Sequence, residues 1–348
     1  MCMMAGYNGT KRAAPILIEM LRKEEGINAG CFTGIATLHE GKIYYRKLAG
    51  NLDRLLAETD AMDLPGSIGI IHSRTPNGVP VDSWAHPFTC EQDGRVRTAL
   101  MLNGMNGCCN ELNLKQYPTV LKKIKEAGYP LKSEADIPKD RILKHPKDGN
   151  KVYQKTDCLA QLASMRILEE GTTPAEALQK TVRELPGENM ILMLSDTAPD
   201  VISWCRVNFP MYIGLTDHGV CMASAPIAFA EHTSQYTLLP ALSAGEVTRE
   251  SFTVKKIMDF PYTVAPITPK VVHDAYEAIS KQIQGGNDHF SKIVKPLFEE
   301  ADCNQSNAIT WAVLSDLHRQ GKIDIEKVLR PGVREELFRT QFHYVWKD

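Results

Sequence analysis

Short apolar segments that end abruptly in polar or glycine residues are the feature that most limits how this 348-residue chain can fold. Segments such as GSIGIIHSR and TALMLNG have the length and composition of buried strands. Residues 11–24 and 156–170 instead place apolar side chains at helical spacing, and Thr173 followed by Pro174 is a helix-start signature. Because strands and helices follow one another without regular alternation, the sequence predicts an α+β domain that runs to about residue 255.

The last part of the chain has a different character. A proline-rich stretch, PYTVAPITP, precedes segments of helical periodicity such as TPKVVHDAYEAISKQIQ and SNAITWAVLSDLHRQGK. We therefore expect a first domain over residues 2–255, a linker over 256–266 and a small helical C-terminal domain over 267–348. The sequence does not indicate the role of this helical domain, and it leaves a homo-oligomer open.

Charge and composition argue against several classes of function. The formal net charge of −2 lacks the basic excess of nucleic-acid-binding proteins, and no stretch reaches 18 uninterrupted apolar residues, so we expect neither a nucleic-acid partner nor a membrane span. No basic segment followed by an apolar run opens the chain, so no signal peptide is expected. The nine cysteines form no CxxC pair, which indicates reduced thiols in a cytoplasmic protein without a metal site or cofactor.

Cys2 directly follows the initiator methionine, a position with two interpretations. If Met1 is retained, Cys2 is an ordinary residue near a chain end. If Met1 is removed, Cys2 carries both a thiol and a free α-amine, and an amine with a pKa of about 7.7–8.0 can accept the thiol proton near neutral pH. The small second side chain favours removal, and Cys2 is then a candidate nucleophile with its own base.

Two of the predicted strands end in groups that suit a catalytic site. Arg74 ends the first, and its fork of donors could hold a carboxylate. Asn103 and Gly104 end the second, and a side-chain amide beside an unobstructed backbone N–H could stabilise an oxyanion. A surface salt bridge at Arg74 and a plain turn at Asn103-Gly104 remain the simpler alternatives.

Five stretches in order give the chain a specific resemblance. They are MMAGYNG after Cys2, AGCFTGIATLHEGKIYYRKLAGNLDRLL, GIIHSRTPNGVPVDSWAHPF, LNGMNG and KTDCLAQL. Over about residues 2–250 the chain resembles the class II glutamine amidotransferases of the N-terminal-nucleophile hydrolase superfamily, above all the glutaminase domain of glucosamine-6-phosphate synthase. The resemblance implies a four-layer αββα sandwich, with the small helical region after it.

The resemblance also implies roles for individual residues. Cys2 would be the nucleophile with its α-amine as base, and Asn103 with the Gly104 N–H would form the oxyanion hole. Arg74 would bind the α-carboxylate of glutamine and Asp157 its α-ammonium group. The remaining implied residues are Asn77 and Gly78 in the substrate loop, and His86, which would brace that loop structurally.

The chain also departs from the family pattern. The family motif Arg-Trp-Ala-Thr-His-Gly is replaced by Arg74-Thr75-Pro76-Asn77-Gly78, which is one residue shorter and lacks the tryptophan. Leu102 stands where a histidine is usual, and the segment NAGCFTG has lost an arginine. Fewer than 90 residues follow the first domain, which is too few for the acceptor domains of the relatives.

Three functions fit these observations. The first is a glutaminase that releases ammonia through a γ-glutamyl thioester and supplies a synthase on another chain, which Arg74 and Asp157 favour. The second is a free-standing hydrolase of another γ-glutamyl amide, which the shortened loop favours. The third is an inactive glutamine-sensing scaffold, against which the joint presence of Cys2, Asn103 and Gly104 argues.

Overall fold

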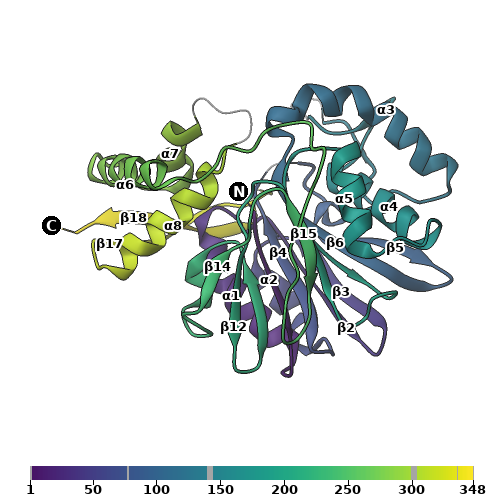
Figure 1. The fold of residues 1–348 in the computed structure, drawn as a ribbon, viewed down its shortest axis with the longest axis horizontal. Coiled ribbons are helices and arrows are strands. Elements are labelled where there is room, and N and C mark those ends of the chain that lie inside the picture. The colour runs from purple at the N-terminus through teal and green to yellow at the C-terminus, as the bar shows by residue number, and fades with distance from the viewer. Residues whose placement is uncertain (1, 77, 139–143, 299–303, 335, 348) are drawn as a thin grey trace.

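The structure is a computed structural model that describes residues 2–76, 78–138, 144–298, 304–334 and 336–347. It has the mixed helix-and-sheet architecture that the sequence predicts, and two antiparallel sheets form its centre (Figure 1). The seven-stranded sheet comprises, in spatial order, β14 (Tyr236–Leu238), β12 (Tyr212–Thr216), β13 (Gly219–Ala223), β1 (Met3–Gly9), β4 (Ile68–Arg74), β2 (Phe32–His39) and β3 (Lys42–Ala49). The six-stranded sheet comprises β16 (Lys255–Lys256), β15 (Ser243–Val247), β11 (Ile202–Arg206), β10 (Glu188–Ser195), β6 (Arg95–Met105) and β5 (Phe88–Gln92).

Helices and short strands surround the two sheets. The α-helices up to residue 184 are α1 (Ala13–Glu24), α2 (Leu52–Glu58), α3 (Asn110–Glu126), α4 (Lys155–Leu168) and α5 (Pro174–Glu184). A small three-stranded sheet contains β7 (Ala135–Asp136), β9 (Lys151–Val152) and β8 (Lys147–Asp148). The 3-10 helices are η1 (Glu25–Ile27), η2 (Ala61–Asp63), η3 (Asp82–Trp84), η4 (Gly107–Cys109), η5 (Pro226–Phe229) and η6 (Lys295–Phe298).

The central strands are buried on both faces, which explains their nearly continuous apolar sequence. Along β10, Met190 and Leu192 belong to the apolar cluster between the two sheets. Ile191 and Met193 point the opposite way, into the cluster shared with α3, α4 and α5. This alternation follows from the two-residue period of a strand. The outer face of the seven-stranded sheet packs in turn against α1.

The C-terminal region differs from its expected all-helical structure. It contains α6 (Pro269–Gln284), α7 (Phe290–Val294) and α8 (Ser306–Arg319), but also a two-stranded hairpin of β17 (Ile323–Pro331) and β18 (Phe338–Trp346). The helical prediction is therefore wrong for the hairpin. The strands contain β-branched and aromatic residues such as Ile323, Ile325, Phe342 and Tyr344, which favour a strand over a helix.

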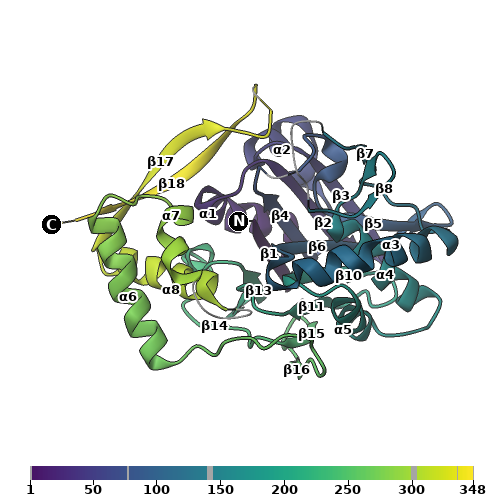
Figure 2. The same ribbon diagram turned by 90° about the horizontal axis from the view of Figure 1, so that it is seen from above.

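The C-terminal helices and hairpin lie together at one end of the molecule (Figure 2). They pack on the cluster that also covers α1, because Trp311 and Phe342 share it with Leu17 and Leu21. The boundaries expected at residues 255 and 267 remain a prediction.

Seven of the described cysteines are free thiols, whereas Cys108 is disulfide-bonded, so the expectation of reduced thiols does not hold there. Within the described ranges, none of the helices combines the length and apolar character needed to cross a bilayer.

Candidate active site

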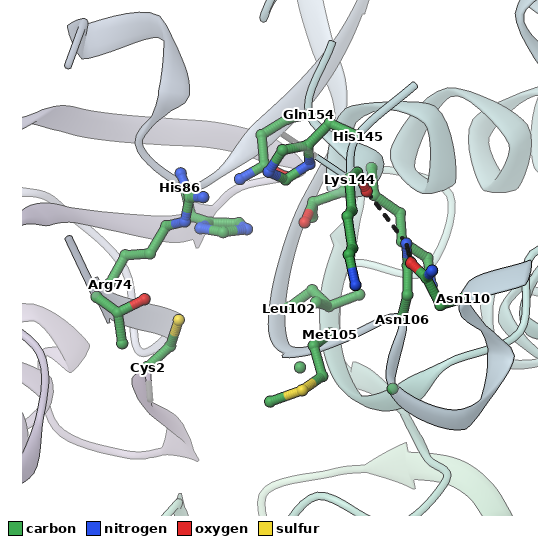
Figure 3. A pocket seen from close by; sticks show the side chains of 15 residues that line it. Cys2, Arg74, His86, Leu102, Met105, Asn106, Asn110, Lys144, His145 and Gln154 are labelled. Atoms are coloured by element: carbon green, nitrogen blue, oxygen red, sulfur yellow. Dashed lines mark hydrogen bonds between the residues drawn. The ribbon is translucent and has the colours of Figure 1, made fainter. Parts of the chain in front are cut away.

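A cavity of about 470 Å³ opens where several strands and helices end (Figure 3). Its lining includes four of the eight site residues singled out from the sequence, together with a second group contributed by the α3–α4 connection and the start of α4. The lining residues are Cys2, Arg74, Thr75, His86, Leu102, Gly104, Met105, Asn106, Gly107, Asn110, Lys144, His145, Gln154, Lys155 and Thr156.

Strand pairing brings these ends together. β1 and β4 are antiparallel with Met3 opposite Ser73, so the start of β1 lies beside the end of β4. The register therefore places Cys2 next to Arg74. β6 belongs to the other sheet, where it pairs with β10 with Met105 opposite Glu188. Gly104 near its end lines the same cavity as Cys2 and Arg74.

Arg74 is a buried cation without a buried anion. Its side chain is 5% exposed, lies near the rings of Phe32 and Trp84 at 5.1 and 5.6 Å, and donates through Nη1 to the Trp84 carbonyl at 3.1 Å. Burial lowers its pKa to about 10, so the guanidinium stays charged at neutral pH. No described carboxylate forms an ion pair with it, and it faces a cavity. An arrangement of this kind is suited to an anionic ligand.

Asn103 and Gly104 contribute differently from one another. Gly104 lines the cavity with a φ of 148°, and an added Cβ would lie 2.1 Å from the Glu188 carbonyl oxygen, so the position requires glycine. Asn103 is fully buried behind it, and its Nδ2 donates to Ser224 Oγ at 2.7 Å. Ser224 Oγ also accepts from the Met4 N–H at 2.9 Å, which ties Asn103 to the strand that carries Cys2.

Asp157 does not line the cavity. One of its oxygens accepts from the Ser133 N–H and hydroxyl at 2.7 and 2.8 Å, and the other accepts from Gln161 at 3.1 Å. Burial raises the pKa of this carboxyl group. With both oxygens engaged inside the protein, Asp157 can reach a substrate ammonium only if these bonds rearrange, and its assignment to that role remains a prediction.

His86 lies in the cavity wall and is buried. Its ring packs on His72 and Phe88 at centroid distances of 4.0 and 5.2 Å, and neither ring nitrogen has a hydrogen-bond partner among the described residues. Burial lowers its pKa well below the ordinary value, so the ring is neutral. These contacts fit the packing role expected of it. Of the two predicted loop residues, Gly78 lies against Trp84 and Arg74, whereas Asn77 lies outside the described residues.

The sequence did not reveal the second group of cavity residues. Lys144, His145, Gln154 and Lys155 come from the α3–α4 connection, which has neither an apolar period nor a recognisable motif. Burial lowers the pKa of His145 to about 3 and that of Lys155 to about 7. A signal that could have pointed to this group is the helix start at Lys155, since α4 begins at the cavity next to the predicted Asp157.

The ionisable side chains that line the cavity are basic, apart from the thiol of Cys2. Arg74, Lys144 and Lys155 line it, and its described lining contains no carboxylate. No group of three His, Cys, Asp or Glu side chains suited to a metal ion occurs in the described part of the chain. The wall therefore combines a thiol, the basic side chains of Arg74 and Lys144, the amine of Lys155 and amide donors, a set suited to thiol chemistry on an anionic compound.

Comparison with known proteins connects this site to a family. A glutamine–fructose-6-phosphate aminotransferase (isomerizing) from Pyrococcus horikoshii is 26% identical over 326 residues, which is 93% of this chain and 47% of that protein. The corresponding protein from Chlorobaculum tepidum is 28% identical over 348 residues, or 98% and 48%. The chain is a homologue of the class II glutamine amidotransferases. The resemblance expected from its motifs is thus confirmed.

This amidotransferase homologue spans about half the length of the curated relatives it matches. No protein-family model matches it. Among solved structures, a glutamine phosphoribosylpyrophosphate amidotransferase from B. subtilis superposes with a TM-score of 0.57 at 14% identity, covering 82% of this chain and 58% of that one. That similarity concerns the fold.

Proposed function

We propose that this chain is an amidohydrolase that uses the thiol of Cys2 to cleave the side-chain amide of glutamine. The observation that carries the proposal is the presence in one cavity of Cys2 and the buried guanidinium of Arg74, which forms no ion pair with a described carboxylate. A γ-amide needs a nucleophile at its carbonyl carbon and an anchor at the far end of the molecule. The adjacent ends of β1 and β4 provide the two groups side by side.

The proposed reaction proceeds in two steps. After removal of Met1, the α-amine of Cys2 takes the thiol proton, and Sγ forms a bond to the amide carbon while the carbonyl oxygen becomes an oxyanion. The C–N bond then breaks, ammonia leaves with the proton, and a γ-glutamyl thioester remains. Water adds to this thioester, releases glutamate and restores the thiol. Atoms and charge balance without an oxidant or a metal.

The end of β6 supports stabilisation of the oxyanion. Gly104 lies at the cavity wall without a side chain. Asn103 Nδ2 has two hydrogens, and one is held by Ser224 Oγ. In the proposal the other hydrogen and the Gly104 N–H donate to the oxyanion. Loss of one such donor typically slows catalysis by about 100-fold to 1000-fold.

The destination of the ammonia and the wider architecture belong to the same proposal. We propose that the ammonia passes to a synthase on another polypeptide, a use of the glutamine nitrogen that the aminotransferase name of the relatives supports. The outer helices and paired sheets support a four-layer αββα arrangement for residues 2–255, with the C-terminal region as a separate unit.

A second candidate, hydrolysis of a different γ-glutamyl amide, is favoured by the cationic cavity wall.

Mass and kinetics test the proposal together. Intact-protein mass spectrometry should show the loss of Met1, and a glutamine-like electrophile should add one equivalent at Cys2. Cys2→Ala should lower glutamine hydrolysis by at least about 10⁴-fold. Cys31→Ala is the matched control, because burial raises the pKa of this neighbouring thiol to about 11 and keeps it protonated. Glutamine hydrolysis that survives in Cys2→Ala would refute the proposal.

A further inference from the structure

The cavity extends beyond the groups that the proposed chemistry uses. In Figure 3, Cys2 and Arg74 lie on one side, whereas Lys144, Asn106 and Asn110 lie on the other. The cavity volume of about 470 Å³ falls in the range of pockets that hold drug-sized ligands, larger than a free amino acid needs. The far side, which we call the lysine end, comprises Lys144, Lys155, Asn106 and Asn110.

Contacts at the lysine end leave donors available for a ligand. The Asn106 side chain donates to the Lys144 carbonyl at 3.1 Å and holds the backbone of Lys144 in place. The Lys144 ammonium has no hydrogen bond or ion pair with a described residue, and in Figure 3 its side chain reaches toward Leu102 and Met105 inside the cavity. Asn110 accepts a bond from Asn106 at 3.3 Å through Oδ1, which leaves its Nδ2 hydrogens for another partner.

Lys155 adds a second amine. It is 5% exposed, and its Nζ donates to the Pro186 carbonyl at 2.7 Å. It forms no ion pair with a described residue. Glu188 is the nearby carboxyl group that influences it, and burial raises the pKa of Glu188 while it lowers that of Lys155 to about 7. The lysine end therefore offers a ligand the side chain of Lys144, and Lys155 adds an ammonium group below about pH 7.

We propose that the lysine end binds a carboxylate carried on the amide nitrogen of the substrate, so that the substrates of this site are γ-glutamyl amino acids. This inference rests on the Cys2 chemistry of the proposed function and specifies the substrate class of its second candidate, a γ-glutamyl amide other than glutamine. Arg74 would hold the α-carboxylate of the γ-glutamyl part, and Lys144 with Asn110 would hold the carboxylate of the attached amino acid. The N-substituent occupies the space between them that glutamine leaves empty.

The chemistry changes only in its leaving group. Cys2 Sγ forms its bond to the γ-carbon, the C–N bond breaks, and the amino acid leaves with the proton taken from the thiol. Water then hydrolyses the γ-glutamyl thioester to glutamate. One water molecule is consumed, and the products are glutamate and a free amino acid.

A matched set of substrates tests the inference. γ-Glutamylglycine and γ-glutamylglycinamide have the same shape but differ by one negative charge, and glutamine lacks the substituent. Wild-type protein should cleave γ-glutamylglycine with a kcat/KM at least about 10-fold above that of the glycinamide, because a hydrogen-bonded charge in a partly buried site discriminates by about that factor. Lys144→Met should lower this ratio about 10-fold, mainly through the KM of γ-glutamylglycine.

The control is Lys147→Met, which removes an exposed lysine three residues away that does not line the cavity. The kcat/KM ratio of γ-glutamylglycine to γ-glutamylglycinamide in Lys147→Met should equal that of the wild type. Lys144 is exposed, so its replacement should fold, and thermal unfolding of both variants verifies this.

Equal cleavage of the acidic and neutral substrates, or equal losses in Lys144→Met and Lys147→Met, overturns the inference. If glutamine is cleaved through Cys2 without any acidic preference, the proposed function survives and the inference alone fails. If no γ-glutamyl compound reacts at Cys2, both fail.

Discussion

At the scale of single residues, Arg74 lacks an anionic partner among the described residues, and Gly104 lacks a side chain. Arg74 is buried among aromatic rings with a single described hydrogen bond to a backbone carbonyl. Such a cation costs stability unless an anion joins it. Gly104 lacks a side chain at a place where any Cβ would overlap a carbonyl oxygen. Arg74 is explained better by a ligand than by packing, whereas close backbone packing already requires glycine at 104.

Arg74→Met separates ligand binding from folding. We expect the variant to lose about 100-fold in kcat/KM for γ-glutamyl substrates, because the substrate carboxylate loses its charged partner. Its melting temperature should stay equal to that of the wild type or rise, since an uncompensated buried charge is removed. Arg22→Met, which breaks an exposed pair with Asp53, is the control for activity. Activity within threefold of the wild type in Arg74→Met would contradict the assignment.

Gly104→Ala tests the geometry at the end of β6. The new Cβ would meet the Glu188 carbonyl at 2.1 Å in a backbone conformation that L residues rarely adopt. We expect the free energy of unfolding to fall by about 3 kcal/mol and hydrolysis to be lost. Gly94→Ala has a φ of 72° but open space around its Cβ, so it should cost only about 1 kcal/mol. Urea titrations of the two variants compare these values, and equal costs would contradict the prediction.

At the scale of secondary-structure elements, Glu25 joins several of them beneath the site. It follows α1, and its carboxylate accepts from the Ser73 hydroxyl on β4 at 2.7 Å and from the Leu52 N–H at the start of α2 at 3.0 Å. The Thr33 hydroxyl on β2 lies 3.3 Å away. Burial raises the pKa of Glu25 to about 7. Strand β4, which ends in Arg74, is therefore hydrogen-bonded to a carboxyl group that titrates near neutral pH.

This linkage predicts a pH dependence of stability. Between the unfolded pKa of 4.5 and the folded value of about 7, the folded state holds a proton that the unfolded state has lost, so stability falls as pH rises through this window. Glu25→Gln removes the effect. We expect its free energy of unfolding, relative to wild type, to increase by about 3 kcal/mol between pH 4.5 and pH 7.5.

Glu58→Gln, at an exposed site paired with Arg54, provides the comparison and should show no such trend. Chemical denaturation at several pH values gives the measurement. A constant difference between Glu25→Gln and wild type across the pH range would show that Glu25 does not titrate in this window.

The elements also show what the sequence could and could not predict. The strands that supply Arg74 and Gly104 were predictable because each is a short apolar run with a polar end, whereas the strand after Cys2 was indicated only by the family resemblance. The helix α3 was not, because Pro118 lies inside it and its exposed positions dominate its composition. The cavity wall from the α3–α4 connection was missed for a related reason, since Lys144 and Lys155 are brought there by tertiary packing and not by a local pattern.

At the scale of the whole molecule, the C-terminal region is joined to the rest by polar bonds as well as by apolar contacts. Arg206 donates to Gln305 at 2.7 Å, Asn208 donates to the Asn304 carbonyl at 2.7 Å, and the Tyr212 hydroxyl donates to the Ala308 carbonyl at 3.1 Å. Shared burial and shared hydrogen bonds favour cooperative unfolding of the two regions. The sequence suggested a linker at residues 256–266 but contained no sign of this contact, because the contacting residues are far apart along the chain.

Trp311→Ala tests this cooperativity. Trp311 is 1% exposed in the cluster shared with α1, so its truncation should lower the free energy of unfolding by about 3–5 kcal/mol. We expect one unfolding transition by both circular dichroism and tryptophan fluorescence, shifted as a whole. The exposed Val272→Ala on α6 should shift it by less than about 0.5 kcal/mol. An early transition confined to the C-terminal region, with hydrolysis retained, would contradict the expectation.

The hairpin of β17 and β18 has a consequence for how the site is made. A Cβ added at Gly26 would meet the ring of Phe342, and one added at Gly30 would meet Arg339. Arg339 also donates to the Ala29 carbonyl, 310 residues earlier in the chain, and the adjoining Cys31 N–H bonds the carbonyl of Arg74. During translation, the backbone beneath Arg74 therefore stays uncovered until residues 338–346 have left the ribosome, so the finished site forms only after this hairpin has been made.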